Sequence, residues 1–365
     1  MDETYKIDDN RLMDDFKIKT FSGYKKSDVI NTLFKSIEQK KVENACNWTI
    51  ECIISGYTMK LWEKLLIFSC KVVHINNPRL PFYLLNKNMI LNNQLKRLNV
   101  NDKDIILILR DSQMIRNLFF DVISTLTMSN KTKRYDKLPK INEKEDFDFS
   151  NIKTRMKATM NIIPNYILKF DDPDELKIII NEIYFNLKNN LSGYDRSCYW
   201  ILWLLHWEKL HKKNKNNWNV GIRDVNVKEK YKNDVIWVIW DTIKEEVKFR
   251  LENNNNEYNN NIKKYIDSLF ELFIYNYSSG KRNVRLPYIF NAIGYLTHNI
   301  DFKIPLRCDI CLFIQTQSKV NKMFKDKKIY EINNPIVKKI ENNKKKLTSE
   351  KEIMLDKLSI FNSFD

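Results

Sequence analysis

Apolar residues recur at intervals of three and four along most of the chain, which is the spacing of one face of an α-helix. Val29, Ile30, Leu33, Phe34 and Ile37 form the first such face. The pattern then predicts helices over 43–55, 59–74, 82–96, 102–110, 112–128, 176–188, 195–211, 235–249 and 262–277. Few windows alternate with period two, and the short run 105–109 is the one β-branched stretch that could form a strand. The fold is therefore predicted to be all-α.

Local residue choice also predicts where several helices begin and end. Ser27 or Asp28 suits the N-cap of the first helix. Gly56 ends the second helix, and the turn around Pro78 ends the third. In the sequence 171–174, Asp-Asp-Pro-Asp, a proline lies in a first turn and acids lie near the positive end of the helix dipole. This sequence predicts a strong helix start.

Charge and periodicity divide the chain into five predicted segments. Residues 1–23 are acidic and are expected to form a mobile arm, and residues 129–171 are charged without clear periodicity and are expected to form a linker. The other three segments are a helical half at 24–128, a second helical half with basic and Asn-rich loops at 172–317, and a Lys-rich helical C-terminal region at 318–365.

The two helical halves share landmarks in the same order. Cys-x-Trp occurs at Cys46 and again at Cys198, and Asn-x-Arg-Leu-Pro-aromatic occurs around Arg79 and again around Arg285. We therefore expect an internal duplication that builds two similar helical layers, with extra residues in the loops of the second half. Core packing is the simplest role for the Cys-x-Trp residues. In the second landmark, the proline is expected in the first turn of a new helix, with the arginine capping the previous helix or binding a carboxylate.

Composition excludes several classes of protein. The 365 residues include only 6 Gly, and no Gly-x-x-x-x-Gly-Lys-Ser/Thr phosphate loop occurs, so no ATPase domain is expected. The longest apolar runs have about eight residues, whereas a membrane span needs about 20, so no membrane contact is expected. The acidic start does not resemble a secretory signal. Six sparse cysteines are typical of reduced thiols in an intracellular protein.

Segment 29–90 resembles the helical C-terminal region of the replication-associated recombination protein A family, AAA+ ATPases related to clamp loaders. The resemblance rests on the helix entry at 45–48, the stop at Gly56, the long helix at 62–74 and the Asn-Pro-Arg-Leu-Pro turn at 77–81. In that family the region is a collar that assembles subunits and carries no catalysis. Because the phosphate loop is missing here, the resemblance implies only an assembly role.

The whole chain is similar to a family of uncharacterised proteins from large nucleocytoplasmic DNA viruses of the mimivirus and phycodnavirus kind. The similarity rests on the Asn/Lys/Ile bias, the Phe-Ser-Gly-Tyr-Lys-Lys sequence at 21–26 and the Asn-Pro-Arg-Leu-Pro turn. It implies an intracellular location in the host cytoplasm or a viral factory, or packaging in the virion, and other viral proteins as partners. Self-association into a homo-oligomer stays open.

Basic segments are the main candidate for binding chemistry. Lys and Arg total 62 against 46 Asp and Glu, a net charge of +16. Clusters of cations near aromatic residues suit phosphate neutralisation with base stacking. The alternative is that AT-rich codons supply lysines to an ordinary solvated surface. The candidate nucleic-acid-binding residues are Lys131, Lys133, Arg134, Lys137, Lys140, Lys212, Lys213, Lys215, Lys281, Arg282 and Arg285.

Metal and catalytic motifs are weak by comparison. Cys308 and Cys311 form one Cys-x-x-Cys without a second pair, and their apolar neighbours favour a buried helix over a zinc site. His206-Trp207-Glu208 together with this pair contains the letters of a nucleobase deaminase, but not its spacing. No catalytic residue, metal or cofactor is therefore expected.

The sequence favours a non-enzymatic helical interaction or assembly protein of a large DNA virus. It would bind nucleic acid electrostatically, without strong sequence preference, in viral DNA metabolism or in the virion. The alternative is a purely protein-binding structural component, such as a capsid or viral-factory scaffold. An enzyme with an unrecognised site is the third hypothesis.

Overall fold

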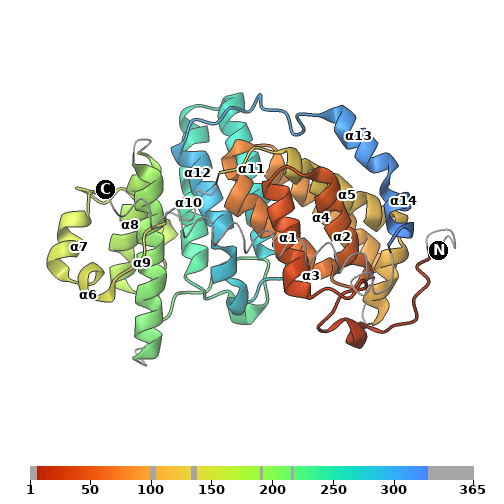
Figure 1. Ribbon diagram of the computed structural model, residues 1–365. Coiled ribbons are helices and arrows are strands. Elements are labelled where there is room, and N and C mark those ends of the chain that lie inside the picture. Colours follow the sequence, from red (N-terminus) through yellow and green to blue (C-terminus); the bar gives the residue numbers. More distant parts are fainter. Residues whose placement is uncertain (1–5, 99–103, 133–137, 190–191, 215–217, 328–365) are drawn as a thin grey trace, which may run out of the picture. The chain divides into compact units, whose positions relative to one another are not determined.

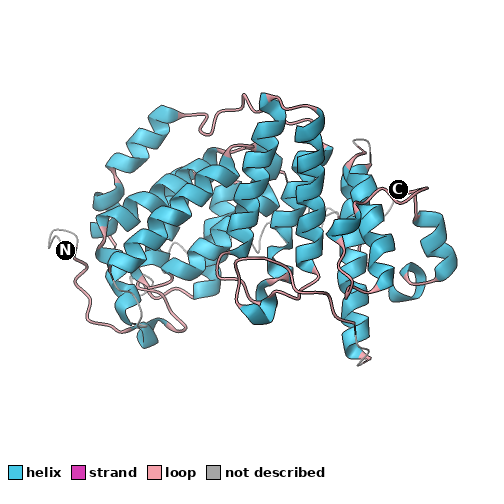
Figure 2. Cartoon of the chain, turned by 180° about the vertical axis from the view of Figure 1, so that it is seen from behind, coloured by secondary structure: helices cyan, strands magenta, loops and turns pink. Residues whose placement is uncertain are grey.

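The computed structural model describes residues 6–98, 104–132, 138–189, 192–214 and 218–327, and the elements in them are helices (Figures 1 and 2). Within these residues no strand forms, and β-type pairing is limited to an isolated bridge between Lys19 and Lys25. The run 105–109 lies in a 3-10 helix, η5 (Asp104–Asp111), rather than a strand. The predicted all-α fold is confirmed.

The chain divides into two compact units, which are described separately. Unit 1 comprises Met1–Leu61, Leu95–Thr127 and Asp309–Asp365, and unit 2 comprises Trp62–Gln94 and Met128–Cys308. The boundaries of these units differ from those of the predicted halves, 24–128 and 172–317. The turn at 77–81 and most of the helix after it belong to the same unit as the second half of the chain.

Unit 1 is built around α1 and α2, two helices consecutive in sequence that pack on each other. Its elements are η2 (Met13–Phe16), α1 (Lys26–Glu38), α2 (Val42–Ile54), the start of α3 (Thr58–Phe68), η5, nearly all of α5 (Gln113–Met128), α13 (Ile310–Ser318) and α14 (Val320–Lys325). Val29, Leu33 and Ile37 on the predicted face of α1 are buried. η5 and α14 also pack on α2, and Phe324 of α14 lies 6.2 Å from Phe120 of α5 between ring centroids.

Gly56 ends α2 as the sequence predicts. Its φ is +69°, in the left-handed region that glycine favours. The amide of Tyr57 donates to the carbonyl of Cys52 at 2.8 Å, and the amide of Gly56 donates to Ile53 at 3.1 Å, which is the hydrogen-bond pattern of a Schellman motif. A Cβ atom at position 56 would lie 2.3 Å from the sulfur of Met13, so both conformation and space require glycine here.

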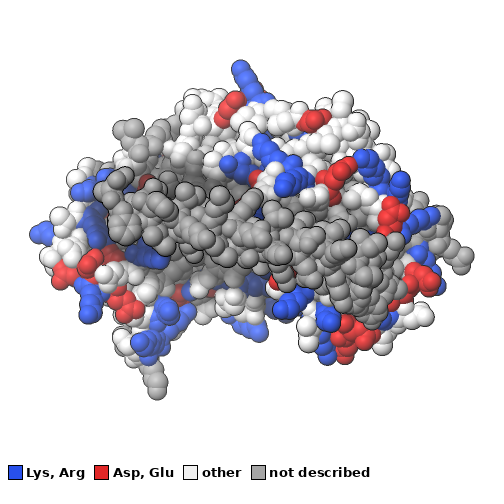
Figure 3. Space-filling view, in the orientation of Figure 1, with Lys and Arg blue, Asp and Glu red and all other residues white. Residues whose placement is uncertain are grey.

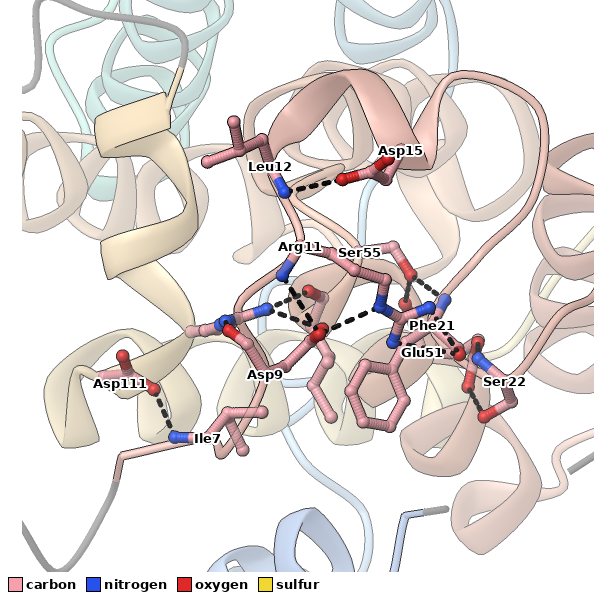
Figure 4. A network of polar contacts seen from close by, with 12 residues as sticks. Ile7, Asp9, Arg11, Leu12, Asp15, Phe21, Ser22, Glu51, Ser55 and Asp111 are labelled. Atoms are coloured by element: carbon pink, nitrogen blue, oxygen red, sulfur yellow. Dashed lines mark hydrogen bonds and ion pairs between the residues drawn. The ribbon is translucent and has the colours of Figure 1, made fainter. Parts of the chain in front are cut away.

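The N-terminal segment differs from the mobile arm that its acidity predicts. The amide of Ile7 donates to Asp111 at 2.8 Å, and Asp9 forms ion pairs with Arg11 at 2.8 Å and Arg110 at 3.3 Å (Figure 4). Phe16 is completely buried. Ion pairs with arginines and the burial of an aromatic ring hold this segment in place. The acidic charge of the segment alone therefore did not reveal that it packs against the fold. Residues 1–5 lie outside the described part.

A buried carboxylate continues this network at the start of α1. Glu51 of α2 is fully buried and accepts hydrogen bonds from both the amide and the hydroxyl of Ser22, each at 2.8 Å (Figure 4). Lys327, just after α14, forms an ion pair with the same carboxylate at 3.2 Å. Glu51 therefore joins the N-terminal segment and the C-terminal helices of unit 1 to α2.

Unit 2 places α12 against four other helices. Its elements are the rest of α3, the π-helical turn η3 (Ser69–Val73), η4 (His74–Asn76), α4 (Leu80–Arg97, to residue 94), α6 (Glu143–Asp146), α7 (Phe149–Arg155), η7 (Asn165–Ile167), α8 (Asp174–Leu187), α9 (Gly193–Lys213), η8 (Glu229–Tyr231), α10 (Ile236–Asn253), α11 (Glu257–Ile274), η9 (Ser279–Lys281), η10 (Asn283–Arg285) and α12 (Leu286–Thr297). α12 contacts α8, α9, α10 and α11, and nearly all of its residues are buried. The predicted central helix, α9, packs on α8 and α12.

Of the segment expected to be a linker, 129–171, residues 138–171 are structured and attached to α8. It contains α6, α7 and η7. The amides of Lys157 and Ala158 donate to Glu182 at 2.9 and 2.8 Å, and the amide of Ile162 donates to Asn181 at 2.8 Å. Side chains of α8 accept hydrogen bonds from the main-chain amides of this segment and so hold it in place. The segment therefore needs no periodic apolar face, and its sequence pattern is irregular.

Local structure at the repeated landmarks is similar in the two halves. Cys46 and Cys198 are both fully buried, on α2 and α9, and each of these helices packs on the helix that precedes it. Pro81 and Pro287 both lie in the first turn of a helix, as predicted. Between the landmarks the first half has α3, whereas the second has α10 and α11, so a whole helix accounts for much of its extra length. Duplication of the halves stays a prediction.

Candidate nucleic-acid interface

The first predicted basic cluster, 131–140, is described only at its ends. Lys131 is half-buried, and its ammonium donates to the carbonyl of Ser129 at 2.7 Å. Lys140 is exposed. The candidates Lys133, Arg134 and Lys137 lie outside the described residues, as do the C-terminal lysines from 338 to 346.

The described part of the second cluster, Lys212 and Lys213, lies on the last turn of α9. Lys212 forms an ion pair with Glu208 at 2.6 Å, and Lys213 is exposed, whereas Lys215 lies outside the described residues. Trp218, expected to stack on bases beside these lysines, is buried, and its indole donates to Glu175 at 3.0 Å. The lysines can therefore contact phosphate, but Trp218 does not present its ring for stacking.

The third cluster is occupied inside the fold. Arg282 forms ion pairs at 2.7 Å with both Glu208 and Asp234, and Lys281 pairs with Glu63 at 2.6 Å. Arg285 is buried and donates to the carbonyl of Phe273 at 2.5 Å. Arg285 thus caps the preceding helix, one of the two roles that the sequence predicts for it. The cations of this cluster are held by protein groups and are not available to bind phosphate.

Both cysteines of the Cys-x-x-Cys sequence are exposed, in contrast to the buried helix that their apolar neighbours predicted. α13 buries Thr316 but leaves Ile310 and Ile314 exposed, because only a narrow stripe of this helix packs on the rest of unit 1. No group of three or more His, Cys, Asp or Glu that could hold a metal occurs among the residues described.

A pocket of about 700 Å³ in unit 2 combines cations with aromatic rings. Its lining includes Arg155 and Lys157, at and after the end of α7, and Arg196, Tyr199 and Trp200 from the first two turns of α9. We call it the α7–α9 pocket. Pro139, Thr154 and Asp195 complete the lining, so Lys140 directly follows a pocket residue.

Asp146 of α6 fixes the wall of the α7–α9 pocket. This buried carboxylate pairs with Arg155 and accepts from the hydroxyl of Tyr199 at 3.0 Å, and the Asp146 carbonyl accepts from the indole of Trp203 at 2.7 Å. The guanidinium of Arg155 lies 5.1 Å from the centre of the Tyr199 ring. Burial raises the pKa of Tyr199, and the charge of Arg155 opposes this shift. The side chain of Tyr199 is therefore held in place by Asp146, and its hydroxyl stays protonated.

Two cations of the pocket remain available for an anion. Arg196 and Lys157 form no ion pair within the described residues. The ammonium of Lys157 donates to the carbonyl of Thr154 at 3.1 Å. Asp146 neutralises Arg155, and Asp195 is the one acid in the lining, so the pocket keeps a net positive charge. On the face shown in Figure 3, the charged side chains form several separate groups with both signs mixed.

A second pocket contains a carboxyl group and an amine whose pKa values are both shifted by burial. It lies along α10 and α11, has a volume of about 720 Å³, and includes Asp241 and Lys244 in its lining. Burial raises the pKa of Asp241, opposed by Arg223, and burial lowers the pKa of Lys244, opposed by Asp241. The lining alternates acids with lysines and contains no histidine or cysteine, so it offers no organised nucleophile and base.

The sequence did not identify the residues of the α7–α9 pocket. Arg155 and Lys157 lie in the segment expected to be a linker, and Arg196 lies on a helix expected to be apolar almost all round. One signal was present: Arg196 and Tyr199 are three residues apart, which places them on one helix face. The position of Arg155 beside Tyr199 depends on Asp146, which bonds to both, and residue spacing in the sequence could not show it.

Comparison with protein-family models, with curated proteins and with solved structures finds no match to this chain. The resemblances to the clamp-loader-like collar and to the viral family therefore stay predictions. No helix in the described ranges is both long and apolar enough to cross a membrane.

Proposed function

We propose that this chain is a non-enzymatic helical interaction protein that binds nucleic acid electrostatically through the α7–α9 pocket and the exposed lysines of α9. The observation that carries the proposal is that Arg196 and Lys157, which have no carboxylate partner among the described residues, line the same pocket as Tyr199. Cations neutralise phosphates, and an aromatic face beside them accepts an unstacked base. The net charge of +16 adds a long-range attraction for polyanions.

Single-stranded nucleic acid suits this arrangement better than duplex. Trp200 is almost completely buried, so Tyr199 supplies the accessible ring and a base must leave its stack to reach it. Contacts between lysine and the phosphate backbone of a nucleic acid carry no information about its base sequence. We therefore expect binding without strong sequence preference, with affinity that falls as salt rises.

The test is fluorescence anisotropy with a labelled single strand and a matched duplex at several salt concentrations. The double variant Arg196→Gln/Lys157→Gln is expected to weaken single-strand binding about tenfold and to flatten the slope of log affinity against log salt by about one to two units. Lys177→Gln, an exposed lysine on α8, is the control and is expected to change affinity less than twofold. Absence of binding by the parent protein at about 50 mM salt would refute the proposal.

A purely protein-binding role is the second candidate, and exposed apolar side chains favour it. Phe149, Met160, Tyr166 and Phe170 of unit 2 are all more than 60% exposed. Large exposed aromatic residues are typical of protein interfaces. Sedimentation of the parent protein and of Phe149→Ser/Phe170→Ser, without nucleic acid, tests this role. Salt-resistant self-association that the variant abolishes, together with no nucleic-acid binding, would favour it over the first proposal.

A further inference from the structure

A pocket of about 790 Å³ in unit 2 lies where the Asn-Pro-Arg-Leu-Pro turn meets α11. Its lining comes from the start of α4, from α11 and from the loop after α12. We call it the α4–α11 pocket. It is distinct from the α7–α9 pocket, because the two share no lining residue.

Aromatic rings form much of the α4–α11 pocket. Tyr265 stacks on Phe302 with ring centroids 5.6 Å apart and planes 23° apart, and Tyr258 meets Phe302 edge-on at 5.2 Å. Phe82 and Tyr83 of α4 also line the pocket. Tyr265 is buried, and it also stacks on Tyr295 with ring centroids 5.9 Å apart. Tyr258 and Phe302 are half-buried, so their rings keep surface for a ligand.

The cations of the α4–α11 pocket have no carboxylate partner in the part of the chain that the structure describes. Arg79, Lys264 and Lys303 all line it, and none of them forms an ion pair with a described residue. Arg79 uses Nε and Nη2 to donate to the carbonyl of Phe302, at 3.2 and 2.9 Å, which leaves Nη1 without a protein acceptor in the described chain. The ammonium of Lys264 lies 3.8 Å from the centre of the Phe82 ring. Burial raises the pKa of Tyr265, and the charge of Arg79 opposes the shift.

Two amide side chains add hydrogen-bonding capacity. Asn86 of α4 and Asn261 of α11 line the pocket, and neither side chain bonds to another described residue. An amide offers both a donor and an acceptor, the pair that the edge of a nucleobase requires. The acids of the lining, Glu257 and Asp301, leave it a net charge of +1 against the three cations.

We propose that the α4–α11 pocket binds a nucleotide, with the base against Tyr258 and Phe302 and the phosphate on Arg79 and Lys264. The pocket volume lies within the range of small-ligand sites, about 300–1,000 Å³. A phosphate can engage the remaining fork of Arg79 while Lys264 supplies a point charge. The ligand can be a free nucleotide or the phosphorylated end of a strand, since both present the same groups.

Isothermal titration calorimetry of the full chain tests this proposal with a nucleoside 5′-monophosphate, the matching nucleoside and inorganic phosphate. The monophosphate is expected to bind at least about tenfold more tightly than either part alone. Lys264→Gln and Arg79→Gln are each expected to weaken its binding about tenfold. Lys263→Gln is the matched control: it makes the same change one residue away, at a lysine that pairs with Asp267 at 2.5 Å and lines a different pocket.

Equal weakening by Lys263→Gln, or no monophosphate binding at millimolar concentration, would overturn the proposal. Lys264 is exposed, so its substitution keeps the proposal falsifiable even where Arg79→Gln destabilises the fold. Competition by a 5′-phosphorylated oligonucleotide, but not by its 5′-hydroxyl form, would assign the ligand as a strand end. The Arg196→Gln/Lys157→Gln variant is expected to bind the monophosphate normally, so failure here is distinguishable from failure of the proposed function.

Discussion

The guanidinium of Arg285 donates to the main-chain carbonyl of Phe273 at 2.5 Å, and this bond joins the start of α12 to the last turn of α11. The carbonyls of a last helical turn have no partner within the helix, so an arginine from the next element can satisfy one of them. Arg285 is 5% exposed, and burial lowers its pKa. One member of the predicted basic clusters is thus part of the fold.

Replacing this arginine should destabilise unit 2. Arg285→Ala is expected to lower the free energy of unfolding by about 2–3 kcal/mol, because it leaves a buried carbonyl without a donor. Lys281→Ala, which breaks a partly exposed ion pair with Glu63, is expected to cost less than about 1 kcal/mol. Urea titration followed by circular dichroism measures both values. Equal small losses would contradict the capping role.

The thiols should react in two classes. Cys308 and Cys311 are exposed, whereas Cys46, Cys52, Cys70 and Cys198 are buried. Burial raises the pKa of Cys46 to about 12 and that of Cys70 to about 12, and it raises the pKa of the other two as well. Since the thiolate is the reactive form, the folded protein should titrate two thiols with a disulfide reagent, and the unfolded protein six.

The double variant Cys308→Ser/Cys311→Ser controls this thiol assignment. It should show no rapid reaction while folded and should keep the stability of the parent protein, because both side chains are exposed. Rapid reaction of a third thiol in the parent protein would mean that a cysteine placed in the core is accessible.

The stability that the anchored N-terminal segment contributes should depend on pH. The bonds and charges of Arg11 and the charge of Arg110 hold the pKa of Asp9 below 3.8, although desolvation by burial opposes them. A carboxyl with a lowered folded pKa stabilises the fold fully above its unfolded pKa, and that contribution is lost as pH falls through the folded value. Asp9→Asn should therefore cost about 1 kcal/mol at pH 7. Its cost should shrink below about pH 4.

Denaturant titrations at pH 7 and pH 3 measure this dependence. Asp14→Asn is the control, since Asp14 lies in an exposed ion pair with Lys17 and should have little effect at either pH. A cost of Asp9→Asn that stays constant between these pH values would contradict the assignment of Asp9 as an ionised anchor.

Charge at the end of α9 should govern the salt dependence of nucleic-acid binding. Reversing Lys212, Lys213 and Lys215 to glutamate should weaken binding and flatten the slope of log affinity against log salt by about two to three units. The fold should persist, because Lys212 and Lys213 are exposed. Reversal of the exposed Lys319, Lys322 and Lys325 in unit 1 makes the same charge change and should flatten the slope less. Equal effects would show that only net charge matters.

Part of the binding chemistry could be predicted from the sequence, and part could not. Lys213 and Lys140 are exposed as expected of phosphate contacts. Arg282 could not be assigned from composition, because its partners Glu208 and Asp234 are distant in sequence and only the fold brings them within 2.7 Å. For the same reason, the sequence could not show that Arg196 and Arg155 line one pocket or that Arg79 reaches Phe302.

The sequence by itself determined the helices and several of their ends. Helix periodicity is a local property, and the stop at Gly56 and the first-turn positions of Pro81 and Pro287 follow from backbone geometry within a few residues. Tertiary structure decided which charges remain at the surface, because hydrogen bonds and ion pairs depend on groups far apart in the chain. It also ordered the segments at 7–22 and 138–171, where Asp9, Glu51 and Asp146 take the place of an apolar periodic face.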